Sequence, residues 1–361
     1  MTRIPERGEE QNQERAQGWP ALDPQPATPV KSAAAEELQP IPKIELHVHL
    51  EGSLTPDRLR RLADKYQTEL HDERHNGIDE VYAFQTFQEF LQAYRVCCQH
   101  LKQPEDYAQV AADLFRQLAE QRCVYVEVIM TPSICTRFGL PAVEVIEALL
   151  EQAAGASRSG LQVRWIFDTV RQWGPDHSWQ TLEWALQYRQ RGVVAISIGG
   201  DESSQPASLF REIFESAEKQ GLHRTAHAGE ICGARSVWLA IEELRAERIG
   251  HGVRALEDSQ LVEYLARAGI ALDVSITSNL KTGAVDRERQ HPIEEIARRG
   301  LPFTLNSDDP GLFQTTLLRE WEVAAGILGW SAERFVDLMR RTLQYTFLTS
   351  AEREQIGRLL M

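Results

Sequence analysis

The sequence lacks the cysteine patterns of a disulfide-bonded or cysteine-ligated protein. It has five cysteines, an odd number, with two adjacent at Cys97 and Cys98 and no Cys-x-x-Cys pair. Disulfide frameworks use even sets of cysteines, and cysteine metal sites use short paired spacings. We therefore expect all five to be buried apolar residues and the protein to work in a reducing, cytoplasmic setting.

Long apolar runs and an excess of basic residues are also absent. No run reaches the length of a membrane span, and the N-terminus has no apolar signal core. The chain has 39 Lys and Arg against 53 Asp and Glu, a formal net charge of −14. Because nucleic-acid binding depends on clustered cations, we expect neither a nucleic-acid nor a membrane partner.

Length and composition indicate one large domain behind an N-terminal extension. The 361 residues are 42% hydrophobic and 25% charged, as in an average globular protein. Prolines are concentrated in residues 1–43, and this part has little apolar periodicity. We predict a disordered extension over residues 1–40 and one folded domain over residues 41–361.

Short apolar segments alternate with amphipathic segments along the predicted domain. Eight apolar segments predict strands, over residues 44–49, 123–130, 162–168, 193–198, 222–227, 248–250, 270–274 and 303–306. Helical periodicity lies between them, for example over 142–153, 179–189, 208–220, 236–244 and 259–268, and two closing helices fit 332–360. This alternation predicts an α/β fold, a parallel (β/α)8 TIM barrel.

The gap between the first two predicted strands is long enough for a helical insertion. It contains three helical patterns, over residues 56–65, 84–100 and 104–121. An insertion at this point would lie over the C-terminal mouth of the barrel, where this fold places its sites. Apolar side chains of the second pattern could line that mouth, although helix packing explains them equally well: Phe84, Phe87, Phe90, Leu91 and Tyr94.

Four polar side chains at strand ends have the chemistry of a metal site. His47 and His49 stand two residues apart in the first strand, so both imidazoles face the same side. His227 ends the fifth strand and Asp308 follows the eighth, and parallel strand ends meet at one mouth. Three imidazoles and a carboxylate suit one Zn²⁺ per subunit, with a position left for water. The end of the fourth strand carries no lysine, which argues against a two-metal site bridged by a modified lysine.

Three further residues are candidates for acid–base chemistry. A zinc ion makes hydroxide available near neutral pH, but the water must be oriented and the leaving group protonated. His251, at the end of the sixth strand, can hold and deprotonate the water, and Glu230 can protonate a substrate nitrogen. Asp309 can orient the water or bind the substrate, or it can simply form a cap before Pro310.

The motifs around these residues resemble those of one family. His47-Val-His-Leu-Glu-Gly-Ser53, His227-Ala-Gly-Glu230, Gly250-His-Gly252, Thr277-Ser-Asn279 and Ser307-Asp-Asp-Pro310 are similar to motifs of the adenosine and adenine deaminases of the amidohydrolase superfamily. The resemblance runs from about Pro42 to the C-terminus, and the motifs occur in the family's order. It implies a zinc-dependent (β/α)8 barrel that hydrolytically removes ammonia from C6 of an aminopurine.

The resemblance also assigns roles to individual residues. It implies that Glu230 donates a proton to ring N1, that His251 stabilises and deprotonates the attacking water, and that Asp309 contacts the water or ring N7. It places the backbone N–H of Gly200 near ring N3, because the segment Gly199-Gly-Asp-Glu202 is similar to the family's Gly-Asp-Glu turn.

Departures from the family pattern bear on the substrate. Adenosine deaminases usually carry Asp at the position of Glu51, where it holds the ribose 5′-hydroxyl, and Asp at the position of Ser197. The usual Pro before the Thr-Ser-Asn segment is Ile276. Glu51, a candidate substrate-binding residue, resembles adenine-type and other divergent members, so the substrate is an open choice between adenosine and adenine.

A third substrate is suggested by Arg171, which follows the third predicted strand. Some members of the resembled family deaminate aminodeoxyfutalosine, an adenine nucleoside carrying a benzoate, in an alternative menaquinone pathway. Arg171 could pair with that carboxylate, or equally with a nearby acid such as Asp168.

Other classes of function also fit parts of the sequence. The chain could be an amidohydrolase acting on a different amidine or cyclic amide. It could be a non-catalytic metal-binding barrel, although no ligand or acid is missing. The extension over 1–40 could act as a scaffold.

Overall fold

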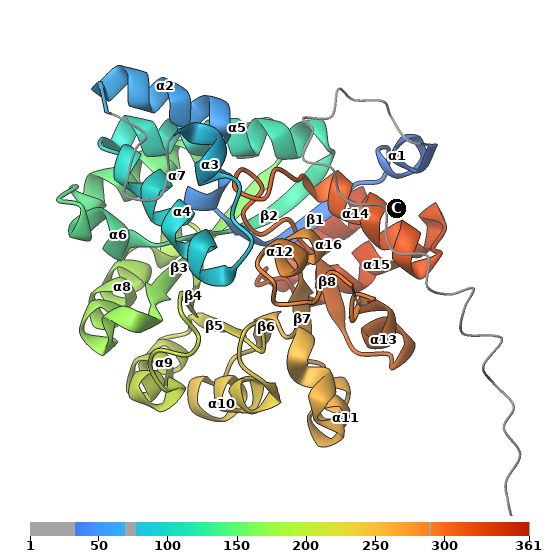
Figure 1. Ribbon diagram of the computed structural model, residues 1–361. Helices are drawn as coiled ribbons and strands as arrows, with labels where there is room; N and C mark the ends of the chain where they lie inside the picture. The colour runs from blue at the N-terminus through green and yellow to red at the C-terminus, as the bar shows by residue number, and fades with distance from the viewer. Residues whose placement is uncertain (1–32, 69–76, 289, 361) are drawn as a thin grey trace, which may run out of the picture.

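A computed structural model describes residues 33–68, 77–288 and 290–360. Eight parallel strands follow one another around a barrel in chain order, and helices surround them (Figure 1). The strands are β1 Lys43–His49, β2 Cys123–Met130, β3 Gln162–Val170, β4 Val193–Gly199, β5 His223–Ala228, β6 Arg248–His251, β7 Ala271–Val274 and β8 Phe303–Leu305. The predicted (β/α)8 barrel is confirmed, and each predicted strand segment coincides with an observed strand.

The helices fill the segments between strands and close the chain. Their bounds are α1 Ala33–Leu38, α2 Pro56–Tyr66, α3 Ile78–Val81, α4 Phe87–His100, α5 Pro104–Glu120, α6 Pro132–Arg137, α7 Ala142–Arg158, α8 Pro175–Gln187, α9 Arg211–Lys219, α10 Ala234–Leu244, α11 Ser259–Ala268, α12 Ile276–Lys281, α13 Ile293–Arg298, α14 Leu317–Leu328, α15 Ala332–Thr342 and α16 Ser350–Leu359. Within the described residues, no helix is long and apolar enough to span a membrane.

The barrel closes between β1 and the segment that follows β8, next to the predicted metal ligands. Val48 on β1 bridges to Asp308, just beyond β8. The His49 backbone N–H donates to the Asp308 carbonyl at 2.7 Å, and the Asp308 N–H donates to the His47 carbonyl at 3.1 Å. The two segments that carry the predicted ligands are therefore joined by their own backbones.

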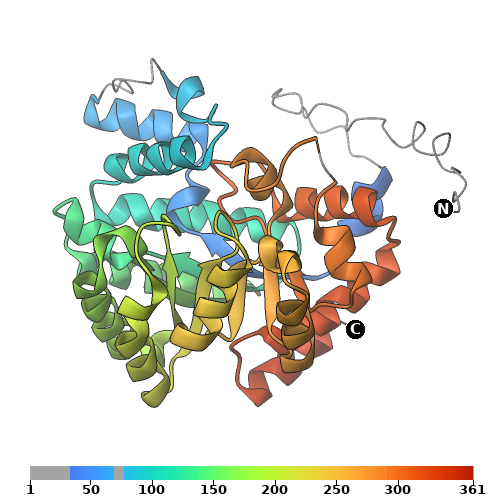
Figure 2. The same ribbon diagram turned by 60° about the horizontal axis from the view of Figure 1, so that its bottom comes forward.

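The predicted insertion is the helical segment α2 to α5, between β1 and β2. Figure 2 shows its first helices standing above one end of the barrel. Thr86 and Glu89 form a capping box that starts α4, which explains why the helix begins at Phe87 rather than Phe84. Phe87 and Phe90 are buried on the face of α4 that covers the barrel mouth.

One part of the predicted extension is ordered. Residues 33–38 form α1 and residues 39–40 a turn, whereas residues 1–32 of the extension lie outside the described residues. Leu38 belongs to the core, and the buried Lys43 side chain donates to the Leu38 and Ile41 carbonyls, each at 2.9 Å. The six residues of this helix are too few to show a helical period, and contacts with distant segments hold it in place.

Candidate active site

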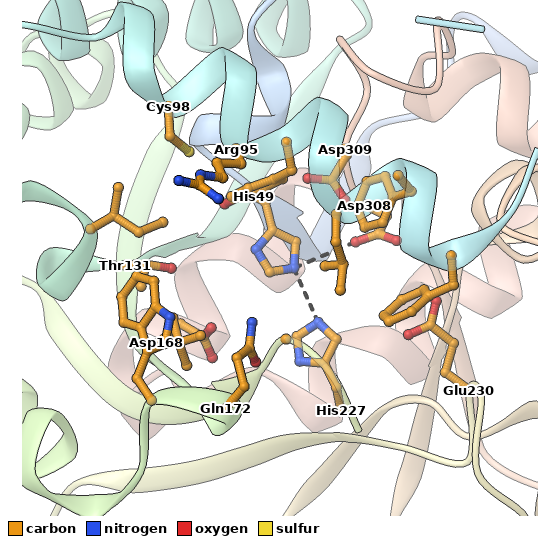
Figure 3. Close-up of a pocket in the computed structure, with 18 of the residues that line it drawn as sticks. His49, Arg95, Cys98, Thr131, Asp168, Gln172, His227, Glu230, Asp308 and Asp309 are labelled. Carbon is orange, nitrogen blue, oxygen red and sulfur yellow. Dashed lines mark hydrogen bonds and ion pairs between the residues drawn. The ribbon is translucent and has the colours of Figure 1, made fainter. Parts of the chain in front are cut away.

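Four side chains gather at the carboxyl ends of β1, β5 and β8. His47, His49, His227 and Asp308 are all buried, and one ligand atom from each lies within 4.8 Å of the others. His49 Nε2 is 3.1 Å from His227 Nε2 and 3.5 Å from Asp308 Oδ1 (Figure 3). Asp308 Oδ1 is also 3.3 Å from His47 Nε2. The structure thus brings together the four predicted ligands.

The donor set fits a zinc ion. His47 Nε2 is buried without a hydrogen-bond partner among the described residues, as expected for an atom that binds a cation, and Nδ1 on the other side of the ring lies 3.9 Å from Asp273 Oδ2. Three imidazole nitrogens and one carboxylate oxygen are ligands that zinc accepts in catalytic sites. The cluster is therefore a metal-binding site by its own chemistry.

The surroundings of the ligands shift their pKa values, and for most of them toward the form that binds a cation. It lowers the pKa of His49 to about 3 and that of His227 well below its ordinary value, so both imidazoles are neutral. Burial raises the pKa of Asp308, but His251 and His47 outweigh it and hold that pKa well below its usual range. Burial also opposes protonation of His47, yet Asp273 and Asp308 raise its pKa to about 9, so metal binding there releases a proton.

Two site residues adopt a backbone conformation that non-glycine residues seldom use. Asp308 has φ of 61° and His251 has φ of 62°. A left-handed conformation at such residues costs free energy and concentrates at functional sites. Here it turns the chain sharply where β8 and β6 end, so that both side chains face the centre of the mouth.

The predicted acid–base residues surround the ligand cluster. His251 Nε2 lies 3.6 Å from Glu230 Oε2 and 3.8 Å from Asp308 Oδ2. Burial lowers the pKa of His251 to about 4, which leaves it neutral. The pKa of Glu230 is raised well above its ordinary value, mainly by burial and also by the charges of Asp308 and Glu202. Burial and Asp308 likewise raise the pKa of Asp309. Both acids therefore favour the protonated form more than a free carboxyl group does.

Two buried residues position this machinery. Glu202 accepts hydrogen bonds from the backbone N–H groups of Gly229, Ile231 and Cys232, so it fixes the loop that carries Glu230. Asn279 Nδ2 lies 3.1 Å from His251 Nδ1, which sets the ring so that its other nitrogen faces the mouth. Both residues lie in segments that resemble the family, but nothing in the sequence predicted which side chains they hold.

A cavity of about 290 Å³ opens beside the cluster. Its inner wall includes His49, His227, Glu230, His251, Asp308 and Asp309, and its outer wall includes Phe87, Phe90, Leu91 and Tyr94 of the insertion helix α4. The predicted apolar wall is thus present except for Phe84, which packs against Phe90 and Phe313 instead. Gly200 also lines the cavity, where a Cβ would lie 2.3 Å from Gln172 Oε1.

The structure does not bring Glu51 or Arg171 to the cavity wall. Glu51 is fully buried behind it, where Oε1 accepts from the Thr131 N–H at 3.1 Å and Oε2 from the Tyr94 hydroxyl at 3.3 Å. Arg171 points inward, and its guanidinium donates to the His227 and Gln205 carbonyls at 3.2 and 3.4 Å. These placements favour supporting roles, in which each residue acts through neighbours that do line the cavity.

Among the cavity-lining residues that the sequence did not single out as site residues, four carry a charged or amide side chain. They are Arg95 on α4, Arg137 at the end of α6, Asp168 on β3 and Gln172 just beyond β3. Asp168 had a detectable signal, because it is an acid near the carboxyl end of a predicted strand. Nothing in the sequence marked Arg95 and Arg137 as site residues, since a charged residue on an amphipathic helix usually just faces the solvent.

Comparison with known proteins identifies the family. The adenosine deaminase family model matches residues 42–360. The chain belongs to the adenosine deaminase family. It is therefore an aminopurine deaminase of the amidohydrolase type, a hydrolase that acts on C–N bonds.

Individual members of the family that resemble this chain act on different substrates. An aminodeoxyfutalosine deaminase of Streptomyces coelicolor is 34% identical over 320 residues, which cover 88% of this chain and 83% of that protein. An adenosine deaminase of Edwardsiella ictaluri is also 34% identical, over 87% of this chain and 96% of that one. The crystal structure of an adenine deaminase from Arthrobacter aurescens has a TM-score of 0.83 at 27% identity, and covers 89% of this chain and 98% of its own.

Proposed function

We propose that this protein catalyses the zinc-dependent hydrolytic deamination of a 6-aminopurine nucleoside, releasing ammonia and the 6-oxo product. The observation that carries the proposal is the pair of buried acids with raised pKa values, Glu230 and Asp309, beside the ligand cluster in one cavity. Two carboxyl groups whose surroundings favour protonation suit a substrate with two ring nitrogens that accept hydrogen bonds, as a purine has in N1 and N7.

His47, His49, His227 and Asp308 would hold one zinc ion, which lowers the pKa of water toward 7 when bound. The neutral His251 hydrogen-bonds to the attacking water and takes up its proton as the oxygen adds to C6. Glu230 gives its proton to N1. The proton held by His251 then passes to the leaving amino group while Glu230 takes up the proton of the C6 hydroxyl, so the C6–N bond breaks and ammonia and the 6-oxo ring form. In this scheme Asp309 donates a hydrogen bond to N7 and the Gly200 N–H donates one to N3, so the ring is held on several edges.

The proposal is tested by ammonia release from purified, zinc-loaded protein offered adenine, adenosine and aminodeoxyfutalosine in parallel. We expect turnover of at least one nucleoside, and a loss of about 10²- to 10⁴-fold in E230Q, because the amide cannot supply the proton. Metal analysis of the same samples should give one zinc per chain in both proteins. Zinc binding without ammonia release from any of the three would refute deamination of these purines.

A second candidate, aminodeoxyfutalosine as the substrate, is favoured by two arginines. Arg95 and Arg137 line the cavity and are otherwise exposed, and within the described part of the chain neither has an acidic partner. Arg137 also stacks on Trp173, with its guanidinium carbon 4.6 Å from the ring centroid, which limits its motion. A carboxylate on the N9 substituent could pair with these cations at the rim. The double variant R95A/R137A should then lose turnover of aminodeoxyfutalosine while keeping turnover of adenosine, and equal losses would exclude this role.

A further inference from the structure

The proposed chemistry leaves one buried acid of the cavity without a role. Asp168, near the carboxyl end of β3, is 3% exposed and lines the cavity. Its Oδ1 has no hydrogen-bond partner among the described residues. Buried polar atoms are nearly always satisfied, so an unpaired acceptor on a residue that lines a ligand cavity points to a donor on the ligand.

The described neighbours of Asp168 satisfy its carboxylate only in part. Its register partner on β4 is Ser197, whose hydroxyl lies nearby but makes no hydrogen bond of good geometry with it. Burial raises the pKa of Asp168 to about 7, and Ser197 only partly offsets this. Asp168 is also outside the group of four metal-ligating residues. The protein therefore leaves the Asp168 carboxylate partly unsatisfied, and a hydrogen-bond donor on the substrate would stabilise it.

The position of Asp168 matches the far end of a bound purine. In Figure 3, Asp168, Thr131 and Gln172 lie on one side of the His49 and His227 rings, and Glu230 lies on the other. A purine with C6 at the metal ligands and N1 at Glu230 presents its N9 end away from both groups. The N9 substituent then lies on the side of the cavity that holds Asp168.

We propose that Asp168 accepts a hydrogen bond from a ribose hydroxyl of the substrate and so selects nucleosides over free adenine. This inference rests on the proposed deamination and adds the class of substrate. The donor could instead be the N9–H of adenine itself. The sugar is favoured because the cavity continues past the ligand cluster to Arg95, Arg137 and Trp173, a space that a free base would leave empty.

The test compares substrates and variants in the zinc-loaded protein. The substrates are adenine, adenosine and the 2′-, 3′- and 5′-deoxyadenosines, and the variants are D168A and D168N. D176A is the matched control, because Asp176 is an exposed acid in the first turn of α8 and does not line the cavity. Steady-state kcat/KM for ammonia release, zinc content and thermal unfolding are measured for each protein.

We expect D168A to lower kcat/KM for adenosine about 10- to 100-fold, as for a lost hydrogen bond to a charged group, and to leave adenine unchanged. D168N should lose less, since its amide oxygen still accepts. One deoxyadenosine should show the same loss in the wild type and no further loss in D168A, as in a double-mutant cycle. D176A should match the wild type.

Three results would overturn the inference. Equal losses for adenine and adenosine in D168A would mean a general structural role. A selective loss for adenine would assign the N9–H as the donor. Equal wild-type turnover of adenosine and all three deoxyadenosines would exclude hydroxyl recognition, and this arm needs no variant to fold. If wild-type protein deaminates none of the purines, the proposed function itself fails, which is a distinct outcome.

Discussion

The Asp309 carboxylate occupies the space that a side chain at Gly52 would fill. A Cβ on Gly52 would lie 1.6 Å from Asp309 Oδ1 and 2.4 Å from its Cγ. Gly52 lies in the short helical turn Glu51–Ser53 just after β1, and Asp309 lies just after β8. The glycine of the first motif is therefore needed for the position of an acid in the last motif, more than 250 residues later.

Replacing Gly52 with alanine should displace Asp309 and leave the ligand cluster in place. We expect G52A to lower kcat/KM for the nucleoside substrate by about 100-fold, because small misplacements of reacting groups are costly. Zinc content should stay at the wild-type level. G326A is the matched control, since a Cβ on Gly326 in α14 meets nothing within 4 Å. Wild-type turnover in G52A would show that Asp309 is not needed where it lies.

Asp168 should destabilise the fold at high pH. Its folded pKa is about 7 against an ordinary 3.8, so the folded protein loses stability as pH rises from about 4 to 7. D168N removes the ionisation. In zinc-free protein we expect D168N to be more stable than wild type at pH 8, by a few kcal/mol at most, and similar to it near pH 4. Urea unfolding at both pH values measures this, and a difference that does not change with pH would contradict it.

Arg171 should act through the backbone rather than the substrate. Removal of its guanidinium takes a hydrogen bond from the buried carbonyl of His227 and another from the partly buried carbonyl of Gln205, so R171A should lower the free energy of unfolding by about 1–3 kcal/mol. Turnover of adenosine and aminodeoxyfutalosine should fall by the same factor. A loss confined to aminodeoxyfutalosine would instead support the carboxylate pairing that the sequence suggested.

Asn279 should matter for turnover and little for metal binding. It lies 3.1 Å from His251 Nδ1, and without it the imidazole can rotate away from the attacking water. We expect N279A to lower kcat about 10-fold or more, a part of the usual contribution of a general base, with zinc content unchanged. Metal analysis and steady-state kinetics on the same preparation separate the two effects. Loss of zinc in N279A would show that Asn279 supports the ligand cluster instead.

The sequence by itself determined the barrel and the ligand cluster. The period of two in β1 places His47 and His49 on one face, and the ends of parallel strands converge whatever the loops do. His227, His251 and Asp308 could be predicted for this reason, because their role follows from where each strand ends. Glu230 and Asp309 followed from their spacing to those ligands.

Only the tertiary structure decided where individual side chains point. Glu51 and Arg171 stand next to the mouth in sequence, yet packing turns both away from the cavity. Asp168 and Arg95 reach it from β3 and from α4 of the insertion, and α1 is ordered by contacts with Lys43 and the core. Periodicity encodes the face and the end of an element, whereas the direction of a long or buried side chain depends on neighbours that come from distant parts of the chain.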